Sequence, residues 1–422
     1  MNAIKQLFGG NTRQFGMIFA LVALIVFFQF MTGGVILTPD NVINLVNGYS
    51  YILILAIGMV LVIIAGHIDL SVGSVAAFVG IVVALTMRDW HLPWYMGIVV
   101  GLVLGALIGA WQGFFVAYVG IPAFIVTLAG MLLFRGANQY FGKSLTVPVP
   151  TDFQFIGAGY LNEVGPDTGY NNLTLLVGFI IVAALIWSGL RNHRKAVALG
   201  ADVKPLWVTI TKLVILCAVV LYATYLFATG RPGTSFPVPG IILGVLVLAY
   251  GFIAARTTIG RHIYAVGGNR HAAALSGVKS KRTDFLVILN MAVLAGLAGM
   301  IFVARSNASG PSDGVGWELD AIAAVFIGGA AVTGGVGTVV GSMIGGLVMA
   351  VLNNGLQLMG VGSDMTQIIK GLVLLAAVVF DVYNKSQGKA SFIGLMMKKL
   401  GGRDNPDLAV AEPLRDAVRT ES

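Results

Sequence analysis

Residues 50–87 read SYILILAIGMVLVIIAGHIDLSVGSVAAFVGIVVALTM. Two apolar runs, 50–66 and 71–87, stand on either side of a short polar break at 67–70. The surroundings continue this pattern, because the whole of 14–134 contains only four charged side chains: Asp40, Asp69, Arg88 and Asp89. A stretch this long and this poor in charge is compatible with membrane helices and their short connections, and with little else.

The composition of the whole chain agrees. Of its 422 residues, 57% are hydrophobic and 10% are charged, whereas soluble domains have about 45–50% and about 25%. A soluble core stops growing at about 250–300 residues, so the surplus apolar side chains would be left exposed to water. The sequence therefore predicts an all-α polytopic membrane protein and excludes a soluble globular one.

About twelve apolar segments are expected to cross the membrane. They are 16–31, 50–66, 71–87, 94–119, 122–134, 173–190, 206–228, 240–255, 285–304, 317–333, 336–357 and 364–383. The segments 71–87 and 122–134 are shorter than the roughly 20 residues that a straight crossing needs. We expect these two to be broken or partly buried helices, because only protein or a wet cavity can satisfy irregular backbone there.

Most of the 26 Lys and Arg residues fall into four clusters. Two precede residue 15, four lie in 191–205, six in 256–284 and seven after 384. Basic residues gather in cytoplasmic loops, and an even number of crossings places all four clusters there together with both termini. The polar connection 135–172 contains only two basic residues and is expected outside. The expected organisation is a transmembrane domain over 1–384, with a cytoplasmic loop at 256–284, and a charged cytoplasmic tail over 385–422.

Several classes of chemistry are excluded. Cys217 is the only cysteine, so an internal disulfide or a thiolate cluster is impossible. The chain contains no G-x-x-x-x-G-K-[ST] motif, so it is not expected to bind ATP or any other cofactor itself. The basic clusters lack interleaved aromatic residues and separate apolar spans, which argues against nucleic acid as a partner.

Two glycine patterns stand out. Five glycines recur at four-residue spacing from Gly97 to Gly113, and a second glycine-rich region runs from Gly328 to Gly346. On a helix the first pattern forms a flat ridge that a neighbouring backbone can approach closely. We expect helix packing at this ridge.

Ionisable residues inside apolar spans are candidates for function. His67, Asp69 and Ser71 lie at the break between the first two runs quoted above, where Asp69 could instead cap the helix that follows. Lys370 lies inside the last span, and Glu318 and Asp320 open the span at 317. Because a buried lysine needs a partner, we expect Lys370 to form an ion pair with Glu318 or Asp320.

The loop 256–284 is more elaborate than a tether needs to be. Gly267, Gly268 and Asn269 are expected to break the chain, and the following residues favour a short helix that Gly277 can end. We interpret this helix as a docking element for a cytoplasmic partner, although a purely structural loop is the alternative. The residues expected to take part in docking are Arg261, Gly267, Gly268, Asn269, Ala272, Ala273, Leu275, Ser276 and Gly277.

An ordered set of short motifs covers roughly residues 50–385. They are Ala65-Gly-His-Ile-Asp-Leu-Ser-Val-Gly73, Phe124-Ile-Val-Thr-Leu-Ala-Gly-Met131, Thr258-Ile-Gly-Arg261, Gly267-Gly-Asn269, Leu275-Ser-Gly277, Ala295-Gly-Leu-Ala-Gly299, Ala321-Ile-Ala-Ala324, Gly328-Gly329, Gly334-Gly335, Asn353-Asn354-Gly355 and Lys370-Gly-Leu372. With these motifs the chain resembles the permease subunits of bacterial sugar ABC importers of the ribose, xylose and multiple-sugar type. It is most similar to the xylose or multiple-sugar branch, because the pair of spans at about 173–228 looks inserted.

The resemblance implies an architecture and a set of partners. It implies a ten-helix core, similar to that of cobalamin importers, plus the inserted pair. It implies a homodimer in the bacterial inner membrane, forming a path for a monosaccharide such as xylose or glucose. ATP and Mg would be bound by a cytoplasmic ABC ATPase subunit, and a periplasmic sugar-binding protein would deliver the sugar.

The resemblance also assigns roles to residues. It makes Gly267 to Gly277 the coupling helix that seats in the ATPase, with Arg270 at a position where an acidic residue is more usual. Candidates for the translocation path or its gate are His67, Asp69, Ser71, Asn353 and Asn354.

Two other functions would need different sequence features. An ion-coupled secondary sugar transporter, the main alternative, needs ionisable groups near the bilayer midplane and internal repeats. A membrane-embedded enzyme needs His, Asp or Glu clustered at one depth. The five His and 18 acidic residues lie mostly in connections and form no such pattern in the sequence.

Overall fold

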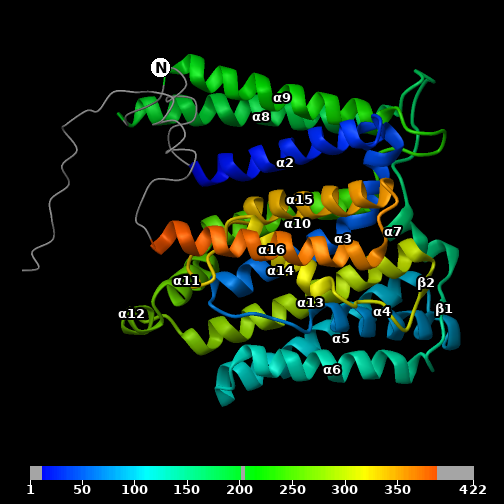
Figure 1. Ribbon diagram of the computed structural model, residues 1–422, viewed down its shortest axis with the longest axis vertical. Coiled ribbons are helices and arrows are strands. Elements are labelled where there is room, and N and C mark those ends of the chain that lie inside the picture. The colour runs from blue at the N-terminus through cyan, green and yellow to red at the C-terminus, as the bar shows by residue number, and fades with distance from the viewer. Residues whose placement is uncertain (1–11, 201–204, 387–422) are drawn as a thin grey trace, which may run out of the picture. The chain divides into compact units, whose positions relative to one another are not determined.

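The computed structural model describes residues 12–200 and 205–386, which are predominantly helical (Figure 1). The helices are α2 (Thr12–Met31), α3 (Pro39–Ile64), α4 (Val72–Asp89), α5 (Trp94–Phe114), α6 (Ala123–Phe141), α7 (Phe155–Ala158), α8 (Asn172–Ala198), α9 (Leu206–Ala228), α10 (Val238–Arg256), α11 (Thr258–Gly268), α12 (Arg270–Leu275), α13 (Ser280–Ser306), α14 (Trp317–Ile327), α15 (Val339–Leu358) and α16 (Ser363–Ser386). The chain divides into two units, Met1–Asp381 and Val382–Ser422, and every contact reported below lies within the first. The predicted tail 385–422 falls outside the described residues except for its first two positions.

Shorter elements complete the first unit. The 3₁₀ turns η1 (Val35–Leu37) and η3 (Thr151–Gln154), the π-helical turn η2 (Phe115–Val119) and the strands β1 (Val147–Pro148) and β2 (Ala308–Ser309) join the helices. The two strands pair antiparallel, with Val147 opposite Ser309. Helices α11 and α12 lie at one end of the bundle and β1, β2 and α7 at the other (Figure 1). We call these the α12 end and the β1–β2 end.

The centre of the bundle is α13, which packs against α5, α4 and α3. The glycine ridge of α5 makes this packing possible. A side chain at Gly105 would meet the backbone of Ala292, and one at Gly109 would meet the backbone of Leu289. The expectation that these glycines serve helix packing is confirmed.

An irregular connection joins α3 to α4. Helix α3 ends at Ile64, and Gly66 takes the left-handed backbone conformation, with φ of +86°, that terminates it. The segment 65–71 is non-helical, and α4 begins only at Val72. In α4, Gly73 faces the backbone of Gly314 and Ala76 faces Gly299 of α13. Helix α4 is unbroken over Val72–Asp89 and largely buried, so of the two alternatives expected for 71–87 the buried helix is confirmed and the broken one is wrong.

A second crossing differs from the prediction. The expected span 317–333 is an eleven-residue helix, α14, that ends at Ile327. At 1.5 Å per residue it is about 16 Å long and cannot cross a hydrocarbon layer of about 30 Å alone. Gly329, Gly334 and Gly335 have positive φ angles, so the glycine-rich residues 328–338 continue the chain as irregular backbone to the start of α15.

The expected pair of spans at 173–228 is a hairpin of α8 and α9 at the edge of the bundle (Figure 1). The two helices pack mainly on each other, and α9 also touches α3. Most of the remaining surface of both helices is exposed and apolar. Such a surface suits contact with lipid.

Among the described residues, eight helices are long and apolar enough to cross a membrane. These are α3, α4, α5 with η2, α8, α9, α10, α13 and α15. The expected class of all-α polytopic membrane protein is confirmed, whereas the count of twelve crossings stays a prediction. Helix α6 is longer than expected because it continues past Phe134 through polar residues to Phe141.

Candidate functional site

The predicted docking segment is a pair of helices, α11 and α12, that form the α12 end of the bundle. Asn269 separates them, and its side-chain oxygen accepts a hydrogen bond of 3.0 Å from the Ala272 N–H, capping α12. The expected chain break at Gly267 and Gly268 is wrong, because both glycines belong to the last turn of α11. The cap at Asn269 starts a new helix without a longer interruption.

The docking residues differ in exposure. Ala273 is buried, whereas Arg261, Asn269, Ala272 and Ser276 are exposed, together with Gly268 and Gly277. Leu275 at the end of α12 is 91% exposed. Leu275 is therefore the large apolar side chain that α12 leaves uncovered.

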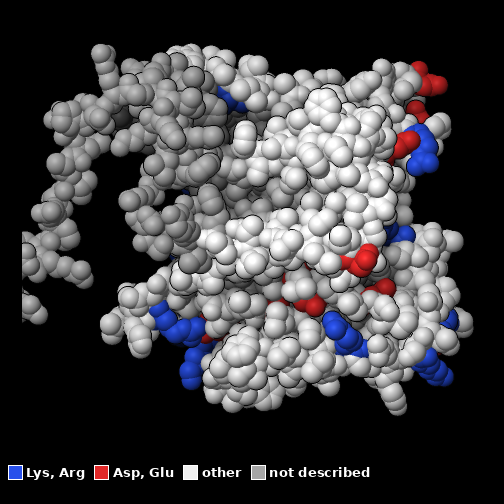
Figure 2. All heavy atoms as spheres, in the orientation of Figure 1, with Lys and Arg blue, Asp and Glu red and all other residues white. Residues whose placement is uncertain are grey.

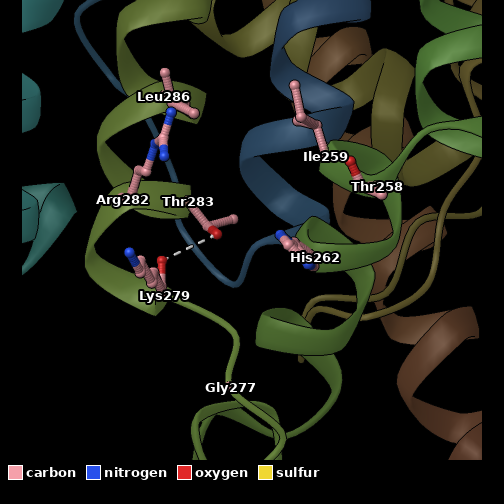
Figure 3. Close-up of a pocket in the computed structure, with 8 residues that line it drawn as sticks. All are labelled: Thr258, Ile259, His262, Gly277, Lys279, Arg282, Thr283 and Leu286. Carbon is pink, nitrogen blue, oxygen red and sulfur yellow. Dashed lines mark hydrogen bonds between the residues drawn. The ribbon is translucent and has the colours of Figure 1, made fainter.

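A cavity of about 360 Å³ opens between α11 and the first turns of α13 (Figure 3). His262 lines it from α11, and Lys279, Arg282 and Thr283 line it from the α13 side. The cavity belongs to the loop 256–284, which carries six of the chain's Lys and Arg residues. It gives the predicted docking surface a hollow with basic residues at its edge.

Helix α11 packs on the glycine-rich residues 328–338. A side chain at Gly267 would collide with the Ile64 carbonyl at the end of α3, and Gly335 N–H donates a hydrogen bond of 2.8 Å to the same oxygen. The Tyr264 hydroxyl donates a hydrogen bond of 2.7 Å to the Gly337 carbonyl. No sequence pattern indicates that the two glycine-rich regions meet, because nearly seventy residues separate them.

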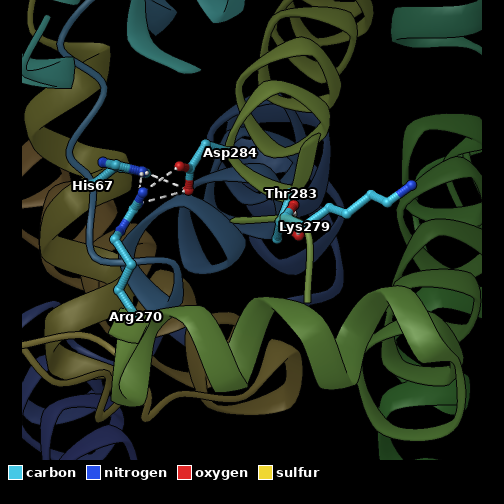
Figure 4. A network of polar contacts seen from close by, with 5 residues as sticks. All are labelled: His67, Arg270, Lys279, Thr283 and Asp284. Atoms are coloured by element: carbon cyan, nitrogen blue, oxygen red, sulfur yellow. Dashed lines mark hydrogen bonds and ion pairs between the residues drawn. The ribbon is translucent and has the colours of Figure 1, made fainter. Parts of the chain in front are cut away.

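Three charged or titratable side chains meet beside α12 (Figure 4). The Arg270 guanidinium contacts both carboxylate oxygens of Asp284, with Nη1–Oδ2 at 2.8 Å and Nη2–Oδ1 at 3.0 Å. His67 Nε2 lies 3.0 Å from Asp284 Oδ1 and 3.4 Å from Arg270 Nη2. Asp284 was not among the predicted site residues, since an acidic residue at the end of a basic loop shows no pattern of its own.

Asp69 and Ser71 lie in a buried polar cluster. Asp69 is 1% exposed, and its Oδ1 accepts hydrogen bonds from the Ser71 N–H at 2.8 Å and the Ser71 hydroxyl at 2.7 Å. Gln112 of α5 donates to the Ser71 hydroxyl at 3.0 Å, and Thr127 of α6 accepts from the Leu70 N–H at 3.1 Å. Asp69 therefore fixes Ser71, the residue just before α4. Helix α4 has no side-chain cap at its N-terminus, so the capping alternative is not confirmed. Gln112 and Thr127 were missed because a lone polar residue on an apolar helix carries no distinctive signal.

The expected partner of Lys370 is Asp320. Lys370 Nζ lies 2.6 Å from Asp320 Oδ1, in contact but without a well-aligned hydrogen bond. Glu318 instead faces Arg135 of α6, with Nη2–Oε1 at 3.6 Å. Figure 2 shows that acidic and basic side chains are sparse on this face, with a few gathered between α16 and α6.

The two asparagines predicted for the path differ in their surroundings. Asn354 is buried, and its side-chain amide exchanges two hydrogen bonds with Asn41 of α3, at 2.8 Å and 3.1 Å. Asn353 is half-buried. This pair joins α15 to α3, so in this conformation it acts as a contact between helices.

Comparison with known proteins assigns the chain to a family. A model described as "Branched-chain amino acid transport system / permease component" matches residues 41–378. The chain is 39% identical over 378 residues to the xylose transport system permease protein XylH of Haemophilus influenzae, covering 89% of this chain and 98% of that protein. It is 40% identical over 378 residues to XylH of Escherichia coli K12, covering 89% and 93%.

A more distant relative is named for another pentose. The ribose import permease protein RbsC of Escherichia coli K12 is 34% identical over 350 residues, which cover 83% of this chain and 87% of that protein. No solved structure matches the chain. The family resemblance read from the short motifs is thus confirmed over most of the length.

Proposed function

Because the chain belongs to the permease subunits of bacterial sugar ABC importers, on their xylose branch, we propose that it forms the path by which xylose crosses the inner membrane. The observation that supports xylose as the substrate is the similarity to two xylose permeases over 89% of this chain. The names of the relatives support xylose and, at lower identity, ribose. They give no support to glucose.

The energy source follows from the chemistry of the cargo. A neutral sugar carries no charge that a membrane potential could act on, so uphill import needs another source of free energy. The chain has no phosphate-binding motif. In our proposal a separate cytoplasmic ABC ATPase binds ATP and Mg and hydrolyses the ATP, and this chain binds no cofactor.

The ATPase would dock at the α12 end. Leu275 offers an apolar anchor, and Arg261, Lys279 and Arg282 are exposed positive charges of the same loop. A socket that accepts this surface needs an apolar centre and an acidic rim. The coupling segment would then be Gly267 to Gly277, at the cytoplasmic side together with both termini.

The other partners follow from the same arrangement. The periplasmic sugar-binding protein would dock at the β1–β2 end, and a second copy of the chain would complete the path. His67, Asp69, Ser71, Asn353 and Asn354 remain our candidates for a gate. Because Asp69, Ser71 and Asn354 are buried in hydrogen-bonded contacts, their role would be to hold helices in one of two arrangements.

Reconstituted transport tests the proposal. The chain is purified with the ATPase that accompanies it, placed in proteoliposomes and supplied with the xylose-binding protein outside and ATP inside. We expect concentrative uptake of labelled xylose that stops when ATP is replaced by ADP or when the binding protein is omitted. A matched control is the same complex with a hydrolysis-deficient ATPase.

The same vesicles distinguish ATP-driven import from the alternative, ion-coupled transport. Uptake driven by a proton or sodium gradient in vesicles that contain this chain alone would establish an ion-coupled secondary transporter and refute the proposal. Uptake of ribose in preference to xylose with the matching binding proteins would leave the transport class intact and overturn the assigned sugar.

A further inference from the structure

Asp284 has an unusual position for a carboxylate. It is the only acidic residue in 256–284, where six Lys and Arg lie. Its side chain is only 3% exposed, although it lies in the second turn of α13, close to the α12 end. Burying a carboxylate costs free energy unless oppositely charged and hydrogen-bonding groups compensate. The residues that compensate the buried charge of Asp284 are therefore needed to keep this carboxylate in place.

The compensating residues come from two other parts of the chain. Arg270 is the first residue of α12, and His67 lies in the non-helical segment 65–71 (Figure 4). Arg270 makes two contacts of 2.8 Å and 3.0 Å with the two oxygens of Asp284, and His67 makes one of 3.0 Å. Three elements that are distant in sequence thus meet at one carboxylate.

The geometry at Arg270 restricts movement of α12. A guanidinium that contacts both oxygens of a carboxylate fixes orientation as well as distance, which a lysine ammonium does not. α12 also packs through α11, since Gly267 abuts the Ile64 carbonyl. A displacement of α12 cannot leave Asp284 and the end of α3 in place without breaking these contacts.

The contacts continue from His67 into the bundle. Two residues after His67, Asp69 binds the N–H and hydroxyl of Ser71, the residue that precedes α4. The segment 65–71 forms no helix of its own. The His67 N–H donates to the Val62 carbonyl of α3, and the contacts of the His67 and Asp69 side chains hold the rest of the segment. A shift of His67 therefore has a short route to the start of α4 and to Gln112 and Thr127.

We propose that Arg270, Asp284 and His67 form a charged tie that converts movement of α12 into movement of segment 65–71 and α4. The three are positioning residues for transport and do not contact the sugar. This inference rests on the proposed function, because an ATPase docked on α12 supplies the movement. It assigns Arg270, at a position where the resemblance suggests an acidic residue, an internal partner in place of the ATPase.

The decisive measurement is the number of xylose molecules imported per ATP hydrolysed by the complete transporter. We expect Arg270→Gln to bind the ATPase as the unchanged chain does and to import at least about fivefold less xylose per ATP, the lower range for coupling between sites. Asp284→Asn should show a similar loss. The double variant, Arg270→Gln with Asp284→Asn, should import no less xylose per ATP than either single variant. Each of these three variants breaks the same set of contacts, so their effects should not add.

Two further variants define the interpretation. Arg270→Lys keeps the charge but not the paired contact, and we expect an intermediate ratio. Lys281→Gln removes an exposed positive charge one residue after the start of α13 and should leave the ratio unchanged. Should Arg270→Gln fail to fold because Asp284 is left buried with His67 alone, the double variant, which buries no such charge, carries the test.

The outcomes are distinct. If both the Arg270→Gln variant and the double variant import as many xylose molecules per ATP as the unchanged chain, the proposed tie is refuted. Loss of ATPase co-purification in Arg270→Gln also overturns it, because Arg270 would then be a docking residue. Absence of ATP-driven uptake in the unchanged transporter refutes the proposed function and is seen before any variant is made.

Discussion

Two ion pairs lie among the helices near α14, and the better formed of them joins Lys370 of α16 to Asp320. Both side chains are largely buried, with 22% and 12% of their surface exposed. Removing one partner of such a pair leaves an uncompensated charge in a poorly hydrated place. We expect Lys370→Met to destabilise the protein by on the order of 3 kcal/mol, measured as a lower midpoint of thermal unfolding of the purified chain in detergent.

The matching double variant shows whether the contact itself is responsible. Lys370→Met with Asp320→Asn removes both charges, so it should recover most of the loss. Lys281→Met, on the exposed start of α13, is the control for loss of a lysine charge and should leave the midpoint unchanged. Equal damage in the single and double variants would show that Lys370 and Asp320 do not stabilise each other.

Single residues could be predicted where they interrupt a strong pattern. His67, Asp69 and Ser71 stood out because they break an apolar run, and Lys370 because a charge in a span needs a partner. Their partners could not be predicted. Asp284 lies 217 positions from His67, and Gln112 lies 41 positions from its partner Ser71. Thr127 lies 57 positions from Leu70. Only tertiary packing brings these residues together.

The hairpin of α8 and α9 is the element most separable from the rest. Its two ends meet, because the Asn171 N–H donates a hydrogen bond of 3.3 Å to the Ala228 carbonyl. We expect deletion of 172–228, with the ends joined through a Gly-Ser pair, to leave a folded chain that supports ATP-driven uptake in the reconstituted transporter. The cost should be modest, because the deletion removes the Thr174 hydroxyl that accepts the Phe236 N–H and the contact of α9 with α3.

A control deletion shows whether the chain tolerates loss of any helix pair or only loss of the α8–α9 hairpin. Removing 94–141, which contains α5 and α6, takes away the glycine ridge against α13 as well as Gln112 and Thr127, and it should abolish folding. Loss of monodisperse protein on deletion of 172–228 would show that the α8–α9 hairpin belongs to the core.

Elements were predictable to the extent that apolar length determines them. The run 206–228 coincides with α9, and 94–119 with α5 and η2 together. The prediction failed for 317–333, because average hydrophobicity does not reveal that positive-φ glycines stop α14 at Ile327. It also underestimated α6 and α13, since their terminal turns remain helical through polar residues that a hydrophobic run excludes.

At the scale of the whole molecule, the two ends of the bundle differ in charge. The loop 256–284 at the α12 end carries six Lys and Arg and a single acidic residue, whereas the connection 135–172 carries two basic residues. Basic loops are retained on the cytoplasmic side during insertion. The α12 end should therefore face the cytoplasm, which is also where an ATPase has access to it.

Thiol labelling from one side of the membrane tests this orientation. In a Cys217→Ser background the chain has no other cysteine, so Val164→Cys reports the 135–172 connection and Leu275→Cys reports α12, both at exposed positions. We expect a membrane-impermeant maleimide to label Val164→Cys in intact spheroplasts and Leu275→Cys only after permeabilisation. Leu248→Cys, at an exposed apolar position in α10, should resist labelling in both conditions because lipid keeps its thiol from ionising. The reverse pattern at 164 and 275 would invert the molecule in the membrane, and an ATPase could then not reach α12 from the cytoplasm.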